Sequence, residues 1–122
     1  MTEEEDGVEV KVTAEGKFWY LYGVLHRDDG PAVEYINGEK WWFQYGKEHR
    51  DGGPAIERAD GSKEWFRDGK HHREDGPATV SSDGSRQTYY LNGEPWHDGA
   101  SVVARGKAEK ARALKMKPPP KP

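Results

Sequence analysis

A unit of 23 residues repeats through the middle of the chain and constrains the fold more than any single residue does. The phrase His-Arg-x-x-Gly-Pro-Ala begins at positions 26, 49 and 72, and we call these segments the first, second and third connectors. A second phrase, Gly-x-x-x-Trp-Phe-x-x-Gly, lies between them at residues 38–46 and 61–69. A fixed period of this length is typical of a repeat architecture rather than of one closed globular core.

The local chemistry of each unit predicts a tight β-hairpin followed by a connector. In a connector, Asp before Gly favours a turn, and Pro after Gly suits the first residue of a strand. Asn-Gly or Asp-Gly then separates two strand-like runs, which is the strongest short hairpin signal. The returning strands are predicted at 40–45, 63–67 and 86–91. We therefore predict a mainly β fold, in which tandem antiparallel β-hairpins of period 23 form a single twisted meander sheet or an open half-barrel.

Composition changes along the chain predict its domain organisation. Val8, Val10 and Val12 alternate with charged residues, a pattern typical of a strand with one buried face. Near the other end Ala, Lys, Arg and Glu dominate and favour a short helix. Four segments are predicted: an acidic disordered N-terminus (1–6), a β-hairpin repeat domain (7–99), a basic C-terminal helix (100–117) and a Pro-rich disordered end (118–122).

Charge and cysteine content exclude several classes of protein. Residues 105–122 contain seven Lys or Arg and one Glu, although the whole chain has a net charge of −3. Such a basic tail is expected to fold onto the acidic body or to reach an acidic partner. The chain has no cysteine, which excludes disulfides and thiolate metal sites. No apolar run approaches the ~20 residues that a membrane-spanning helix needs.

The N-terminal residues lack both the basic start and the apolar segment of a secretory signal. A cytoplasmic location is therefore the simplest expectation, and a secreted form without a signal peptide stays open.

The aromatic–glycine spacing at 38–46 and 61–69 resembles the MORN repeat class and its relatives, including antitoxin-type repeats of bacterial genomes. The resemblance covers roughly residues 15–98, and the His-Arg connector departs from it. It implies an elongated β-hairpin sheet that scaffolds proteins, mediates dimers or touches acidic lipids. Similar connectors in small bacterial and phage proteins imply a phage or mobile-element origin.

A weaker resemblance links two aromatic phrases to choline-binding cell-wall repeats. Trp19-Tyr20-Leu21 and the segment 89–93 resemble pieces of those repeats. In them, aromatic side chains cage a quaternary ammonium by cation–π attraction. The missing secretory signal disfavours this interpretation.

Neither catalysis nor metal binding is expected. The three connector histidines lie two strands apart, or ~10 Å, in the predicted sheet. Zinc holds imidazole nitrogen at about 2.0–2.1 Å, so one ion cannot bridge two of them. The sequence has no phosphate-binding loop, nucleophile elbow or His-Glu-x-x-His motif. We therefore expect a protein that is not an enzyme and has no catalytic residues, metal or cofactor.

Residues that recur in successive units are assigned to the scaffold, and one aromatic face is assigned to binding. The scaffold residues are His26, His49, His72, Gly30, Gly53, Gly76, Pro31, Pro54, Pro77, Trp19, Trp42 and Trp65. Side chains alternate along a strand, and an exposed aromatic patch usually marks an interaction site. The arginine fork suits carboxylate or phosphate, although each Arg could instead pair with an Asp of its own or the neighbouring connector. The candidate partner-binding residues are Trp41, Phe43, Tyr45, Phe66, Tyr20, Arg27, Arg50 and Arg73.

These expectations converge on a non-enzymatic protein–protein interaction module. It would bind another protein, or itself as a homodimer, and act as a phage or mobile-element inhibitor or adaptor of a host protein complex. Two alternatives stay open. An anionic polymer, either nucleic acid or acidic lipid, could bind the arginine ladder and basic tail with steep salt dependence. Choline or a glycan could bind the aromatic rows.

Overall fold

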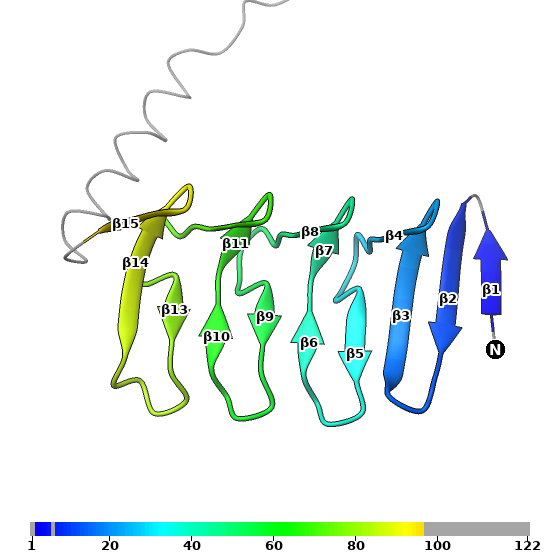
Figure 1. Ribbon diagram of the computed structural model, residues 1–122, viewed down its shortest axis with the longest axis horizontal. Helices are drawn as coiled ribbons and strands as arrows, with labels where there is room; N and C mark the ends of the chain where they lie inside the picture. The colour runs from blue at the N-terminus through cyan, green and yellow to red at the C-terminus, as the bar shows by residue number, and fades with distance from the viewer. Residues whose placement is uncertain (1, 6, 97–122) are drawn as a thin grey trace, which may run out of the picture.

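The computed structural model describes residues 2–5 and 7–96, and these form antiparallel β-hairpins laid side by side in an open ribbon (Figure 1). The prediction of a mainly β hairpin meander is thus confirmed, and the sheet is not closed. The predicted C-terminal helix at 100–117 and the Pro-rich end at 118–122 lie outside the described residues. Among the described residues there is no helix that is long and apolar enough to cross a membrane.

The strands are short, and most of them belong to one sheet. In chain order they are β1 (Thr2–Glu5), β2 (Val8–Val12), β3 (Gly16–Leu21), β4 (Val24–Leu25), β5 (Val33–Tyr35), β6 (Lys40–Trp41), β7 (Phe43–Gln44), β8 (Lys47–Glu48), β9 (Ile56–Glu57), β10 (Lys63–Glu64), β11 (Phe66–Arg67), β12 (Lys70–His71), β13 (Thr79–Val80), β14 (Gln87–Leu91) and β15 (Glu94–Trp96). The 11-stranded sheet runs β1-β2-β3-β5-β6-β9-β10-β13-β14-β15, with β4 beside β3. The pairs β7–β8 and β11–β12 form two separate small sheets.

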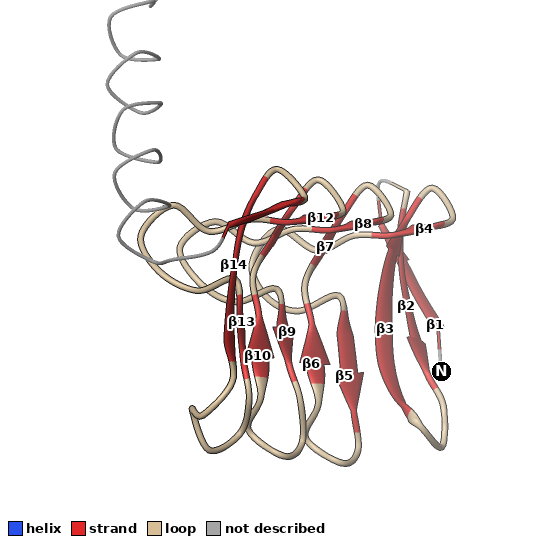
Figure 2. Ribbon diagram, turned by 60° about the vertical axis from the view of Figure 1, so that its left-hand side comes forward, coloured by secondary structure: helices blue, strands red, loops and turns tan. Residues whose placement is uncertain are grey.

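Two of the predicted returning strands, 40–45 and 63–67, are each divided in two at a tryptophan, whereas the third is the continuous strand β14. The Trp42 N–H donates to Ala55 O at 2.7 Å, while the Trp42 C=O accepts from His49 N–H at 3.1 Å. The backbone on either side of Trp42 therefore pairs with different segments, β9 below it and β8 above it. Viewed from the side, the upper hairpins fold across the ends of the lower strands (Figure 2).

The sheet begins earlier than the predicted boundary at residue 7. Residues 1–6 are expected to be disordered because they are acidic, whereas Thr2–Glu5 forms β1 and pairs with β2. Main-chain pairing with an otherwise open strand edge depends little on side-chain type, so composition alone misses this strand.

The core is thin and lies where each connector enters a strand. Ala32, Ala55 and Ala78 are completely buried, and Val33 and Ile56 are almost so. Residues directly opposite each other in antiparallel strands share a face. Trp41, paired with both Val33 and Ile56, therefore lies on the same face as these two buried residues.

The opposite face at this level carries a row of alternating charge. Lys17, Glu34, Lys40, Glu57 and Lys63 pair in register across five successive strands. Each opposite-charge pair across strands contributes roughly 0.2–1 kcal/mol. Because charges of opposite sign pair on this face, a chain rich in charged residues can form a sheet that buries apolar side chains on its other face only.

Candidate interaction surfaces

A Trp–Arg–Gly stack recurs in every connector. In the second connector, Cζ of Arg50 lies 3.8 Å from the centroid of the Trp42 ring, and its Nη1 donates to Pro54 O at 3.1 Å. A Cβ added to Gly53 would lie only 2.9 Å from the same Cζ, so the glycine makes room for the guanidinium. The first and third connectors repeat this geometry at Trp19–Arg27–Gly30 and Trp65–Arg73–Gly76.

The predicted arginine ladder is therefore built into the scaffold. Each guanidinium is also paired with carboxylates of its own unit: Arg27 with Glu34 at 2.9 Å, Arg50 with Glu57 at 3.5 Å, and Arg73 with Asp75 at 3.3 Å. Stacking on tryptophan and pairing with carboxylates therefore give each of these arginines a structural role.

The connector histidines join one unit to the next. His26 is buried, its Nδ1 accepts the Tyr45 N–H at 2.9 Å, and its Nε2 lies 2.8 Å from Asp28 Oδ1. An Nδ1 that accepts requires the proton on Nε2, so the hydrogen-bond network assigns a neutral ring. His49 and His72 accept from the Asp68 and Asn92 N–H groups in the same way. Within the described part of the chain, no group of three or more His, Asp or Glu could hold a metal ion.

Four upper hairpin turns of the described chain have equivalent geometry, and two of them carry an unexpected residue. The two central residues of each turn have positive φ, as in a type I′ turn. The second is always glycine, whereas the first is Asp68 or Asn92 in the last two turns and Tyr22 or Tyr45 in the first two. Asp and Asn tolerate this left-handed conformation, but a bulky residue there is an outlier.

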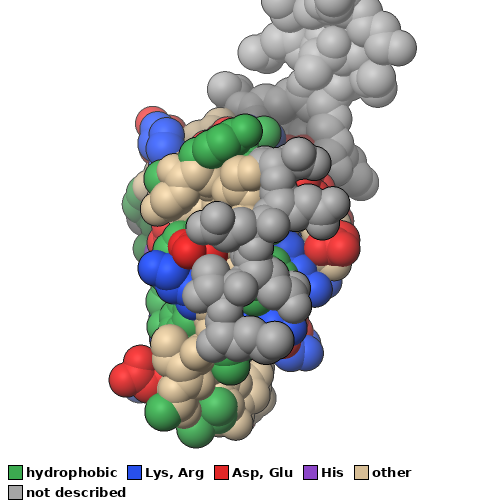
Figure 3. Space-filling view, turned by 90° about the vertical axis from the view of Figure 1, so that its right-hand side faces the viewer, with side chains coloured by type: hydrophobic (Ala, Val, Ile, Leu, Met, Phe, Trp, Pro, Cys, Tyr) green, Lys and Arg blue, Asp and Glu red, His purple; other side chains and the backbone are tan. Residues whose placement is uncertain are grey.

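Both tyrosines are exposed, and with Val24 they are the exposed apolar residues of the first two upper turns, which we call the roof patch: Tyr22, Val24 and Tyr45. The exposed fractions are 81% for Tyr22, 43% for Val24 and 70% for Tyr45. Val24 lies against the Gly46 turn, 3.6 Å from the position of a Cβ at that glycine. The corresponding place in the next two units is taken by Lys47 and Lys70. In the end-on view, hydrophobic side chains lie at the top of the molecule, on the side of the upper turns, and also along one edge and at the bottom (Figure 3).

The other predicted partner-binding aromatics are less accessible. Trp41 and Phe43 are half-buried and stacked, with centroids 6.2 Å apart, and Tyr20 is also half-buried. Phe66 is 8% exposed and belongs to the core cluster with Ala55 and Ile56. Of the predicted aromatic set, the structure brings only Tyr45 to the roof patch.

Sequence reasoning missed Tyr22 and Val24. Tyr22 could have been found from the sequence, because Tyr22 and Tyr45 precede turn glycines at the position that Asp68 and Asn92 occupy in the later turns.

A unit-specific polar cluster lies on the face of the core. His71 Nε2 lies 2.9 Å from Glu64 Oε1, and Arg58 Nη2 donates to Glu64 Oε2 at 2.6 Å. The His71 ring packs between Phe66 and Tyr90, with centroids 4.2 and 5.1 Å away. Burial opposes ionisation of Glu64, but the hydrogen bonds from His71 and Arg58 outweigh it and keep the pKa of Glu64 below its ordinary value.

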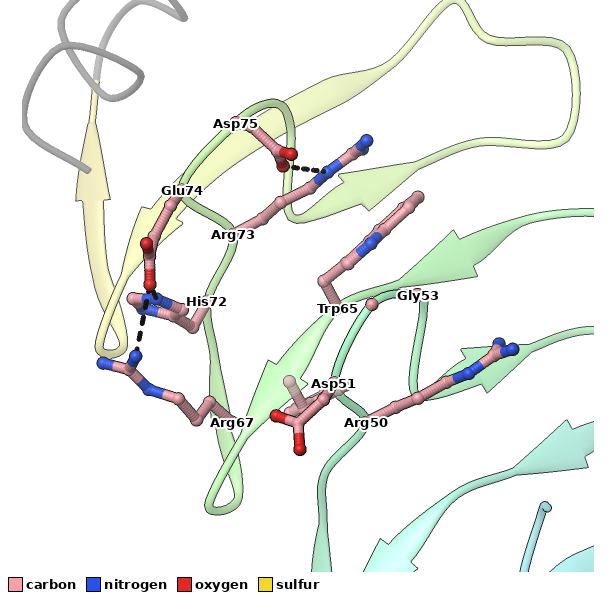
Figure 4. Close-up of a pocket in the computed structure, with 11 residues that line it drawn as sticks. Arg50, Asp51, Gly53, Trp65, Arg67, His72, Arg73, Glu74 and Asp75 are labelled. Atoms are coloured by element: carbon pink, nitrogen blue, oxygen red, sulfur yellow. Dashed lines mark hydrogen bonds and ion pairs between the residues drawn. The ribbon is translucent and has the colours of Figure 1, made fainter. Parts of the chain in front are cut away.

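Grooves open between successive connectors. One of about 530 Å³ lies between the first and second connectors, and one of about 380 Å³ lies between the second and third. Arg50 lines both grooves. Figure 4 shows the second groove, in which Trp65 lies between Arg50 and Arg73.

No protein-family model, curated protein or solved structure matches the chain. Membership of the MORN-like class therefore stays a prediction from the spacing of glycine and aromatic residues. The hairpin repeat itself is established by the strand pairing.

Proposed function

We propose that this chain is a non-enzymatic protein-binding module that docks on a partner protein through the roof patch. The observation that carries the proposal is the pair of exposed tyrosines at φ 45° and 49°. An inhibitor or adaptor of phage or mobile-element origin, acting in the cytoplasm, is the form of this function that the sequence resemblance favours.

The last two upper turns show that the same turn geometry forms without a tyrosine. A side chain in the left-handed region costs roughly 1–2 kcal/mol, and Asn or Asp lowers that cost by local hydrogen bonding. The later turns use Asp68 and Asn92, so the same turn geometry is achieved with less strain. The Tyr45 ring packs on His26, with centroids 4.4 Å apart, and the Tyr22 ring lies over Gly7, but both side chains stay mostly exposed. Strain retained at such exposed positions supports a functional role.

The chemistry of the patch suits a protein partner. Tyrosine is enriched at the energetic centres of protein interfaces, since it buries a large area and keeps a polar hydroxyl. The neighbouring Lys47 and Lys70 extend the roof with cationic heads. The expected partner surface therefore combines an apolar pocket for the tyrosines with an acidic side.

The double substitution Tyr22→Asn and Tyr45→Asn separates function from folding. It should abolish partner binding and raise the free energy of unfolding by about 1 kcal/mol, because the strain is relieved. Ile36→Asn is the matched control, since Ile36 is 79% exposed at a lower turn and has no positive φ. Quantitative affinity purification from the source organism and urea unfolding are measured on all three proteins.

Proteins retained by wild type and Ile36→Asn but lost from the tyrosine variant support the proposal. Equal retention by the three proteins, or a lower urea midpoint for the tyrosine variant, contradicts it. Light scattering at matched concentration shows whether the partner is a second copy of the chain.

A further inference from the structure

We propose that Arg50 and the groove between the second and third connectors bind a carboxylate of a partner polypeptide. The three connectors provide the comparison. In the first, Arg27 Nε donates to Asp29 Oδ1 at 3.1 Å, and in the third, Arg73 Nε donates to Asp75 Oδ1 at 3.3 Å. The second connector has Gly52 where the others have these aspartates.

Arg50 consequently retains an unused donor. Its Nη1 donates to Pro54 O and lies 3.5 Å from Glu57 Oε2. Within the described part of the chain, its Nε has no hydrogen-bond partner, whereas Nε of Arg27 and of Arg73 each donates to an aspartate. The Arg50 side chain is also the most exposed of the three, at 31% against 23% for Arg27 and 26% for Arg73.

The groove has room for the missing carboxylate. A Cβ at Gly52 would meet no atom within 4 Å, so the space beside that residue is open. Gly52 has φ +82°, whereas neither Asp29 nor Asp75 has a positive φ, so the second connector also follows a different path. Figure 4 shows the Arg50 and Arg73 guanidinium groups pointing to the same side, with Trp65 between them.

The ligand class follows from the molecule's own templates. Asp29 and Asp75 show that a carboxylate on Nε fits a guanidinium stacked in this way. Arg–carboxylate hydrogen bonds are charge-assisted and directional. Asp51, Glu74 and Asp75 line the same groove, and Glu57 lies beside Arg50, so a singly charged carboxylate is favoured over a phosphate dianion. An acidic side chain and a chain terminus offer the same chemistry.

The test follows the arginine Nε–H resonances by NMR during titration with sodium acetate at constant ionic strength. The Arg50 signal should shift and saturate, while the Arg27 and Arg73 signals stay in place. Acetyl-Gly-Asp-Gly-amide and acetyl-Gly-Gly-Gly acid then distinguish a side chain from a terminus as the source. A proportional shift of all three arginines, no shift of Arg50, or no response to either peptide overturns the proposal.

Two variants test the site in opposite directions, one by adding a carboxylate beside Arg50 and one by removing the carboxylate beside Arg73. Gly52→Asp adds a carboxylate beside Arg50, at a positive φ that Asp adopts more readily than most residues, and should weaken the acetate response of Arg50 by about tenfold. Asp75→Gly should make Arg73 respond as Arg50 does. Tyr22→Asn with Tyr45→Asn should leave the Arg50 response intact, so failure of this site and failure of the roof patch are distinguishable. An Arg50 response that survives Gly52→Asp, together with an unresponsive Arg73 in Asp75→Gly, contradicts the assignment.

Discussion

Glycine is needed at two adjacent positions of the second connector for two different physical reasons. Gly52 has φ +82° and nothing near its Cβ position, so backbone conformation requires it. Gly53 has no positive φ, but its missing Cβ makes room for the guanidinium of Arg50. The sequence motif identifies both as turn residues and cannot separate steric room from backbone freedom.

Substituting Gly53 by Ala tests the stack at the scale of one residue. The backbone accepts alanine there, and reduced freedom of the unfolded chain alone would stabilise the protein slightly. We expect instead a loss of about 2 kcal/mol, because Arg50 must leave both the Trp42 ring and Pro54 O. The free energy of unfolding is measured by urea titration in a double-mutant cycle with Arg50→Ala.

In the Arg50→Ala background, Gly53→Ala should cost almost nothing. An equal cost in both backgrounds would show that the backbone, rather than the guanidinium, requires glycine.

At the scale of elements, the hairpins depend on side chains that close their lower turns. Asn37, Asp60 and Asp83 each accept a backbone N–H from the residue two positions later, at 3.0, 2.8 and 3.0 Å. Such local bonds mimic a backbone turn and fix the register of the strands they join. Asp83 is the most supported of the three, since the Ser85 and Ser81 hydroxyls also donate to it.

The Asp83 turn predicts a specific pH dependence. Hydrogen bonds from the Ser85 N–H, the Ser85 hydroxyl and the Ser81 hydroxyl lower the pKa of Asp83 from 3.8 to about 2. A lowered folded-state pKa contributes stability that is fully present above pH 3.8 and is lost as pH falls towards 2.

The difference in urea midpoint between wild type and Asp83→Ala should therefore be largest near neutral pH and shrink between pH 3.8 and 2. A difference that stays constant over this range would show that the carboxylate charge is not what stabilises the turn.

At the scale of the whole molecule, the repeat predicted the architecture and its exceptions revealed the candidate sites. Period, turn dipeptides and proline positions predicted a hairpin meander, because each is a local backbone constraint. The bends at Trp42 and Trp65 were not predictable, since they depend on which segment pairs with each side of the residue. The burial of Phe66 likewise depends on the neighbouring unit, which strand alternation does not specify.

For the arginines of the candidate sites, too, the sequence predicted the spacing but not the contacts. Spacing predicted a ladder, and the alternative of pairing within each connector was already visible in the neighbouring aspartates. What spacing could not supply was the contact with the tryptophan rings, which requires the fold. The sequence alone shows that Gly52 replaces the aspartate of the other two connectors. Only the structure shows that these aspartates, Asp29 and Asp75, bind the arginine Nε.

The central claim is that the same Trp–Arg–Gly stack is built at every connector of the open ribbon. NMR of the arginine side chains tests it most directly, because a guanidinium beneath an indole ring experiences its ring current. The side-chain protons of Arg27, Arg50 and Arg73 should resonate upfield of free arginine, and Trp42→Leu should remove the effect from Arg50 alone. Free-chain shifts for all three arginines in the folded protein would contradict the account.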